Sequence, residues 1–384
     1  MYRFFRILGL ACILIAPAAQ PAQAAQGGKR VINSPHNLAT AVPAGNPRAF
    51  TSNMTSQVCA YCHTPHNALP DTPNWNHAPS AAVIYTPYSS STAAASPDQP
   101  TGMSRLCLSC HDGTVALGAV RVSPPGANKS QSANRLTGRA NLTTDLSNDH
   151  PISFAYDAAL VGLNPELADP AGIALPLEDV AGESHLQCTT CHDPHDNDIE
   201  PFLRQTTLDG TLCTTCHTRG GATEAWSASS HATSIKTPTQ GNPWAERKPA
   251  WQGTNVAQNA CFNCHQLHNA ATPQRLIKDI EENTCYLCHD GSAAATDIEA
   301  ESRKAYQHTL EVTPNSDHDA MSAENPLSMP LHVECMDCHN PHAVADAPPM
   351  ISFNPVNPGA PHTEAPAANA MIAGVTGIDL NGNA

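Results

Sequence analysis

The pattern Cys-x-x-Cys-His occurs seven times in this chain of 384 residues. We number these runs one to seven in chain order. They are Cys59/Cys62/His63, Cys107/Cys110/His111, Cys188/Cys191/His192, Cys213/Cys216/His217, Cys261/Cys264/His265, Cys285/Cys288/His289 and Cys335/Cys338/His339. The runs use fourteen of the fifteen cysteines, and the remaining one, Cys12, lies near the N-terminus. Any fold of this chain must therefore accommodate the same motif at seven places.

Two thiols three positions apart can add to the two vinyl groups of one haem, and the histidine that follows can ligate the iron. The pattern therefore predicts seven covalently attached haem c groups. The fourteen cysteines would form the thioether links, and the seven histidines of the runs would be the proximal iron ligands. Disulfides, zinc knuckles and redox dithiols also use paired cysteines, but none of them requires a histidine after every second cysteine.

The composition favours a fold that is filled by cofactors. Aromatic residues make up only 5% of the chain and there are 34 prolines, so loops should predominate and side chains alone would form a small core. We expect a mostly irregular fold with short α-helices around the runs, a haem-packed core and little or no sheet. The best candidate for a longer helix is the segment 295–306, which is rich in Ala, Glu, Arg and Lys.

The N-terminus has the features of a signal peptide. Arg3 and Arg6 precede a short apolar stretch, and the residues before position 25 suit a cleavage site. We expect residues 1–24 to be removed and the mature chain to be exported, to the periplasm or to the cell surface and extracellular space. A lipoprotein signal ending at Cys12 is the alternative. No later stretch is long and apolar enough for a membrane span.

Each iron also needs a sixth ligand or an open position, and thirteen histidines lie outside the runs. Four of these stand three residues after a proximal histidine: His66, His195, His268 and His342. Five more lie before or between the runs: His36, His150, His231, His308 and His318. We predict that these nine histidines are the candidate distal ligands, because the eight methionines follow no comparable pattern. His77 has no repeat partner and is expected at the surface or behind a ligand.

The chain contains an internal duplication. Residues 59–68 (CAYCHTPHNA) match residues 261–270 (CFNCHQLHNA), and CLSCHDG of run two matches CYLCHDG of run six. The segment HLQCTTCHDPH around run three matches HVECMDCHNPH around run seven. Run four has no counterpart in the second half. We predict a signal peptide (1–24), a four-haem domain (25–217), a connecting segment (218–256), a three-haem domain (257–345) and an irregular tail (346–384).

At these residues the chain resembles the multihaem c-type cytochromes with doubled CXXCH motifs. The likeness is clearest at 106–115, 188–195 and 337–342. It implies a multihaem cytochrome c fold, and some members of this broad group polymerise into extracellular filaments in which a neighbouring subunit supplies one axial histidine. A homopolymer is therefore one expected state. By resemblance, the four haems of the first half would be served by His36, His66, His150 and His195. Three haems of the second half would be served by His231, His268 and either His308 or His318.

This assignment leaves His342 without a haem. We expect it to be a vacated ligand in a chain that is shortened relative to larger relatives, or to reach a haem on another chain. Its repeat partner His195 is then predicted to ligate the haem at Cys213, because run four is the one that the second half lacks.

The expected function is electron transfer along bis-histidine haems, by hopping from one haem to the next, and not catalysis. Redox protein partners or an extracellular electron acceptor would complete the pathway. The formal charge of −15 argues against a nucleic-acid partner. The alternative is a multihaem oxidoreductase with one open-site haem.

Overall fold

The computed structural model describes residues 30–39, 54–69, 73–82, 84–90, 93–128, 134–218, 226–305, 335, 339 and 341–342. Within these ranges the backbone is mostly irregular. The α-helices are α1 (Gly102–His111), α2 (Ala158–Leu163), α3 (Cys188–Cys191), α4 (Thr211–Thr214), α5 (Ser230–Thr233), α6 (Val256–Asn259), α7 (Glu281–His289) and α8 (Ile298–Glu301). The 3-10 helices are η1 (Val31–Asn33), η2 (Val58–Tyr61), η4 (Gly138–Ala140), η5 (Pro170–Gly172), η6 (Leu208–Gly210), η7 (Trp226–Ala228), η8 (Pro249–Trp251), η9 (Ala260–Asn263) and η10 (Gln274–Leu276).

Three short strands form one antiparallel sheet in the order β1-β3-β2. They are β1 (Phe154–Ala155), β2 (Glu178–Val180) and β3 (Glu183–Leu186). The β2–β3 hairpin turns at Ala181 and Gly182, whose φ angles of 57° and 91° suit the mirror-image turns that match strand twist. The Gly182 N–H donates to Asp179 Oδ1 at 2.8 Å and closes the turn. The expected fold, with short helices and little sheet, is thus confirmed.

The helix expected at 295–306 is shorter in the structure. In the described part, α8 covers only Ile298–Glu301, and Asp297 caps its start by accepting the Ala300 N–H at 2.8 Å. None of its residues is buried, and Ile298 is 42% exposed. A short helix without a buried face gains little from packing, so good helix formers alone do not extend it.

Apolar side chains gather in several small clusters. Phe154, Tyr156, Leu160 and Leu186 pack beside the sheet, while another cluster joins Tyr85 to Leu108 of α1 and Leu146. Several groups of three or four side chains, in place of one continuous core, agree with a chain poor in aromatic residues.

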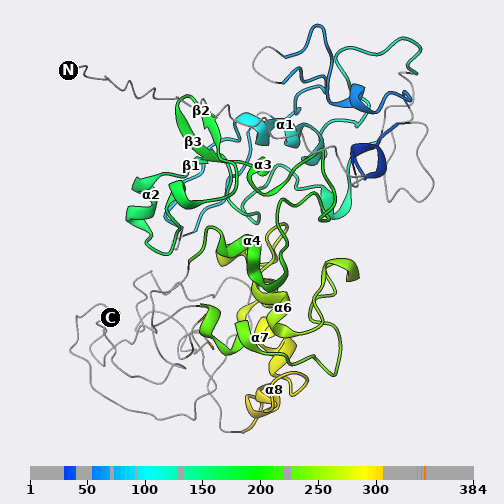
Figure 1. Ribbon diagram of the computed structural model, residues 1–384. Helices are drawn as coiled ribbons and strands as arrows, with labels where there is room; N and C mark the ends of the chain where they lie inside the picture. Colours follow the sequence, from blue (N-terminus) through cyan, green and yellow to red (C-terminus); the bar gives the residue numbers. More distant parts are fainter. Residues whose placement is uncertain are drawn as a thin grey trace, which may run out of the picture.

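The two halves of the duplication are in contact (Figure 1). Tyr88 of the first half packs with Ala270 and Leu276 of the second. The His150 N–H donates to the Leu267 carbonyl at 2.8 Å, and the Ala270 N–H donates to the Asn148 carbonyl at 2.9 Å. The domain boundaries predicted from the sequence stay predictions. Among the described residues, no helix has the length and apolarity that crossing a bilayer would require.

Candidate metal centres

Short helical turns carry the runs. Run two lies on α1 and run six on α7, while α3 and α4 carry runs three and four. Runs one and five begin in the 3-10 helices η2 and η9. Residues at positions i and i+3 lie on the same face of a helical turn, so each turn presents its two thiols on one side. That arrangement is what attachment to two edges of one planar macrocycle requires.

Runs two and six end in the same turn, His-Asp-Gly. Gly113 and Gly291 have φ angles of +69° and +81°, in the left-handed region where glycine commonly ends helices. A Cβ at Gly113 would lie 2.6 Å from Asn141 Nδ2. The carboxylates of Asp112 and Asp290 each accept a backbone N–H two residues later at 2.8 Å. The repeated sequence therefore fixes the same exit from both helices.

Backbone carbonyls orient the proximal rings. The Nδ1 atoms of His63, His192 and His265 lie 2.9, 3.0 and 2.9 Å from the carbonyls of residues 73, 201 and 275. In run two, Nδ1 of His111 lies 2.7 Å from the Ala140 carbonyl. A ring that donates from Nδ1 to a carbonyl keeps its Nε2 lone pair for a metal. These four rings are thus held in the tautomer that an iron ligand needs.

The histidines of runs one to six each face a second imidazole from elsewhere in the chain. The pairs, with ring-centroid separations, are His63–His195 (6.0 Å), His111–His36 (6.2 Å), His192–His268 (6.4 Å), His217–His150 (6.3 Å), His265–His342 (6.0 Å) and His289–His231 (6.2 Å). With metal–nitrogen bonds of about 2.0–2.1 Å and a ring nitrogen about 1.1 Å from its centroid, two imidazoles on one metal have centroids about 6.3 Å apart. The six pairs therefore fit a metal between the rings.

His339, the histidine of run seven, is exposed, and so is His217 of run four. The sequence on both sides of run seven, 306–334 and 343–384, lies outside the described residues, and the predicted distal ligands His308 and His318 belong to it.

The local geometry of run seven still follows the motif. The His339 N–H donates to the Cys335 carbonyl at 2.9 Å, as the His192 N–H does to the Cys188 carbonyl at 3.0 Å. The charge of His339 helps to lower the pKa of His289, after burial and the facing His231. Run seven thus forms the same turn beside run six, and the role of His339 as a proximal ligand stays a prediction.

The second ring of each pair is also oriented through oxygen atoms in four cases. Nδ1 of His36 lies 3.3 Å from the Pro194 carbonyl, and Nδ1 of His231 lies 2.9 Å from the Pro341 carbonyl. These prolines occupy matching positions of runs three and seven, so the duplication extends to the atoms that hold the ring. Nδ1 of His150 lies 3.0 Å from the Pro151 carbonyl, and Nδ1 of His268 lies 3.0 Å from Asp149 Oδ1.

Burial keeps several of these rings neutral. It lowers the pKa of His36 and of His192 to about 4, and the facing histidine adds to the effect in each case. Burial also lowers the pKa of His111, His150 and His289. The neutral imidazole is the form that ligates metals, so the electrostatics agree with the geometry.

The sulfur atoms of consecutive runs are close together. Cys188 raises the pKa of the Cys107 thiol, Cys261 raises that of Cys213, and Cys335 raises that of Cys285, so the sulfur atoms of each pair are close enough to interact. The second cysteines of runs one and two, three and four, and five and six interact electrostatically. Helices α1 and α3 pack together here, and the Cys188 N–H donates to Ser104 Oγ at 3.0 Å. The runs therefore lie in space in their sequence order.

The placement of His195 differs from the sequence expectation. We expected it to serve the Cys213 run, but its ring faces His63 of run one, and His217 faces His150 instead. His342 was expected to be vacated or to act on another chain, and its ring faces His265 of run five. The assumption behind both expectations was that each half supplies its own ligands in order.

The other candidates divide into three groups. His36, His150 and His231 each face a run histidine, as described above. His268 also does so, but it comes from the second half and faces His192 of the first. His66 is exposed and its backbone N–H and C=O contact the Thr64 hydroxyl. His308 and His318, together with Cys338, lie outside the described residues.

Sequence reasoning did not single out the oxygen atoms that hold the rings. Asp149 is 3% exposed and contacts His268; its place directly before a candidate ligand was the only signal. His77, expected near the surface or behind a ligand, is 1% exposed. Its two ring nitrogens lie 2.9 and 3.0 Å from the carbonyls of Ala78 and Ala116, so it joins the chain segments after runs one and two.

The thiol pKa values differ between the cysteines. Burial raises the pKa of the Cys62 and Cys264 thiols to about 11 and that of Cys191 to about 12. The pKa of Cys188 is lowered to about 7 by Cys107, and that of Cys261 is lowered by Cys213, in both cases a cysteine of the preceding run and not of the same one. None of the thirteen described cysteines forms a disulfide. Within the described ranges, no group of three or more His, Cys, Asp or Glu side chains is arranged to hold a metal ion.

A family profile described as "Doubled CXXCH motif" matches residues 180–222 and 254–294. The first segment contains runs three and four, and the second contains runs five and six. No curated protein matches the chain. The matched motif indicates covalently bound haem c, in agreement with the turns, thiols and imidazole pairs described above.

Proposed function

Because the chain carries the doubled CXXCH motif of c-type cytochromes, we propose that it is an exported electron carrier with seven haems c. The motif itself indicates multihaem electron transfer. The number of haems, the path of the electrons and the location are the parts that we propose. When bound, haem supplies one-electron redox chemistry whose potential depends on its axial ligands.

The six facing imidazole pairs are the observation that carries this proposal. Each pair has the separation that two ligands of one metal need, and the Nδ1 contacts leave Nε2 available on most of the rings. At these six runs a second imidazole of the same chain would be available as the sixth ligand of a bound haem. Two histidines give a lower potential than a histidine with a methionine, which suits a carrier at the low-potential end of a respiratory chain.

The order of the runs supports hopping along the chain. Cysteines of runs one and two, two and three, and so on to runs six and seven shift one another's thiol pKa, so consecutive runs lie within electrostatic reach of each other. Covalent links on neighbouring turns fix the spacing, since a thioether holds each macrocycle at its own turn. An electron entering at either end would therefore meet the attachment sites in sequence order.

The competing proposal is a multihaem oxidoreductase, which would need an iron with an open position. In six runs a second imidazole faces the run histidine and would compete with a substrate for a bound iron. Run seven, whose predicted distal ligands lie outside the described residues, is therefore the one to examine first. Binding of cyanide or carbon monoxide to the native protein at a rate typical of an open site would favour the enzyme. An unchanged spectrum in the presence of these ligands would favour the carrier.

The haem content is the direct test. The mature protein from the exported fraction would be measured by intact mass and by pyridine haemochrome absorbance, and its ferric irons by low-temperature electron paramagnetic resonance (EPR). We expect seven haems per chain, all low-spin. Fewer than seven would refute the seven-haem proposal, and recovery in the cytoplasm without haem would refute the proposed location.

The partners that we propose are redox proteins or an extracellular acceptor, together with further copies of this chain. The rings that face runs one, three and five are those that follow runs three, five and seven: His195, His268 and His342. On this pattern His66, which follows run one, would serve a run that precedes the first. We therefore propose that exposed His66 can ligate a haem on a second copy. Electron microscopy and light scattering of wild type and His66→Ala test this, and equal assembly of both proteins would refute it.

A further inference from the structure

One backbone position recurs after three runs and carries a different side chain each time. The N–H groups of Asn76, Arg204 and Lys278 donate to the carbonyl of the second cysteine of runs one, three and five, at 2.7, 2.9 and 3.0 Å. In each case the preceding residue forms a β-bridge with the proximal histidine of that run. The three residues are therefore structurally equivalent, and each lies beside its own attachment site.

At run one this position is neutral. Asn76 is 1% exposed, and its amide group is fully used by the backbone. Nδ2 donates to the carbonyls of Ala60 and Val122 at 2.6 and 2.9 Å, and Oδ1 accepts the Val122 N–H at 2.8 Å. Asn76 therefore closes a loop and places no net charge near the site.

At run three the position is a cation that water reaches. The side chain of Arg204 is 29% exposed and pairs with the Asp193 carboxylate at 3.3 Å. Its Nε donates to the Thr189 carbonyl at 2.8 Å. Asp193 is itself 32% exposed, so solvent and the partner carboxylate both weaken the field of this cation.

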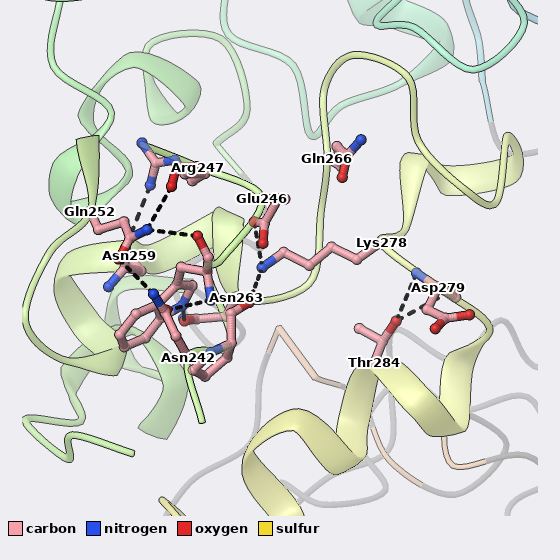
Figure 2. Close-up of polar contacts among 12 residues, drawn as sticks. Asn242, Glu246, Arg247, Gln252, Asn259, Asn263, Gln266, Lys278, Asp279 and Thr284 are labelled. Carbon is pink, nitrogen blue, oxygen red and sulfur yellow. Dashed lines mark hydrogen bonds and ion pairs between the residues drawn. The ribbon is translucent and has the colours of Figure 1, made fainter. Parts of the chain in front are cut away.

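At run five the position is a buried cation. The side chain of Lys278 is 6% exposed, and its Nζ lies 2.8 Å from Glu246 Oε1 and 2.8 Å from the Pro243 carbonyl. Figure 2 shows the lysine extending toward Glu246, away from the turn that leads to Thr284 and α7. Burial lowers the pKa of Lys278, and the Glu246 carboxylate opposes this effect, so the two acceptors favour the ammonium form.

The Lys278 ammonium acts on two attachment sites. Its charge opposes the effect of burial on the pKa of both the Cys264 and the Cys288 thiols, so it lies within electrostatic reach of runs five and six. Glu281 is also buried and acts on Cys264 with the opposite sign. The partner Glu246 is 23% exposed as a whole side chain, but the Oε1 atom that faces Lys278 is buried. The carboxylate therefore offsets part of the field of the lysine.

We propose that Lys278 raises the reduction potential of the haems attached to runs five and six above that of the haem of run one, whose equivalent residue is the neutral Asn76. The inference rests on the proposed function, because it requires haem at these runs. Reduction of ferric haem removes one positive charge, so a fixed cation in a poorly screened place stabilises the reduced state. The haems of runs five and six would then hold electrons more strongly than the haem of run one.

The test uses the full-length holoprotein and three variants: Lys278→Gln, Lys278→Arg and Arg204→Gln. Redox titrations would be followed through the paramagnetically shifted haem methyl resonances, which resolve individual haems. We expect Lys278→Gln to lower the midpoint potential of one or two haems by about 59 mV. For a one-electron reduction, this shift is a factor of about ten in the equilibrium constant. Lys278→Arg keeps the charge and should keep the wild-type midpoints. Arg204→Gln should shift its haem less, because that cation is partly exposed and paired.

Two results would overturn the inference: unchanged midpoints in Lys278→Gln, or a shift in Arg204→Gln as large as that in Lys278→Gln. Haem counts by mass are taken on the same samples, so that haem-free runs refute the proposed function and not the role of Lys278. If Lys278→Gln fails to fold, Lys278→Met serves in its place, with the same midpoints as the deciding measurement.

Discussion

Replacing His268 with alanine removes one of the contacts between the two halves of the chain. The ring of His268 faces His192 at 6.4 Å and contacts Asp149 Oδ1 at 3.0 Å. Asp149 is almost completely buried and keeps one donor in the variant, the Asn269 N–H at 3.1 Å. The substitution therefore removes a proposed axial ligand and half of the hydrogen bonding described for one buried carboxylate oxygen.

The expected loss of stability follows from these contacts. A hydrogen bond to a charged group contributes about 1.5–3 kcal/mol, and the His268 side chain is 44% exposed while that of Asp149 is 4% exposed. Because solvent weakens the exposed side of the pair, we expect a loss of about 1–2 kcal/mol. For a chain of this size, each kcal/mol lowers the melting temperature by about 2–4 °C.

The assay combines thermal unfolding with EPR spectroscopy of the ferric protein. His268→Ala should convert one low-spin haem to a high-spin or water-ligated one. The matched control is His66→Ala, because His66 occupies the same place in the repeat but its ring faces no run histidine among the described residues. The control should keep the low-spin count of the isolated chain and its melting temperature. Seven low-spin haems in His268→Ala, or equal effects of both variants, would refute the pairing across the halves.

Three further predictions follow from the structure. His195→Ala should yield one high-spin haem, and this signal should disappear when the cysteines of run one are also replaced but persist when those of run four are; the reverse result, read by EPR, would restore the sequence-based assignment. Gly113→Ala should lower the unfolding free energy by about 1–2 kcal/mol because of its left-handed backbone, and by more because the new Cβ collides with the Asn141 side chain. Gly291→Ala should lower it less, because the nearest neighbour of its Cβ would lie at 3.3 Å. Equal losses of stability for the two variants in calorimetry would contradict this. Tyr85→Phe removes a 2.7 Å hydrogen bond to the Asp112 carboxylate and should cost about 1.5–3 kcal/mol in denaturant unfolding, with haem content unchanged as the control.

The local part of each site could be predicted from the sequence. The thiols and proximal histidine of a run lie within five consecutive residues, so one helical turn decides their relative positions. The duplication was also informative, because His195 and His342 face the first runs of their own halves, and His36 and His231 face the second runs. Matching sequence therefore produced matching geometry, including the proline carbonyls that hold the rings.

The pairing of distant histidines could not be predicted from the same patterns. Which ring faces which run depends on how the loops pack, and we assumed that each half was self-sufficient. His268 contradicts that assumption, because its neighbours Leu267 and Ala270 hydrogen-bond to residues of the first half. The motif does not encode exposure either, since the same five-residue pattern gives exposed His217 and His339 but a partly buried His192. The burial of Lys278 could not be predicted from the sequence either. A lysine between two runs is expected at the surface, and only the structure shows the Glu246 side chain beside it.

The interleaved pairing has a consequence for how such a chain matures. Residues emerge from the ribosome in order, so the turn of run one is complete long before its facing histidine, His195, follows. The same delay applies to run three, which waits for His268, and to run five, which waits for His342. During synthesis there is therefore always an attachment site whose second ligand has not yet arrived. At each stage of synthesis, the nascent chain would therefore contain a recently made site that still lacks its second ligand. If synthesis stopped at that stage, this site would stay incompletely ligated.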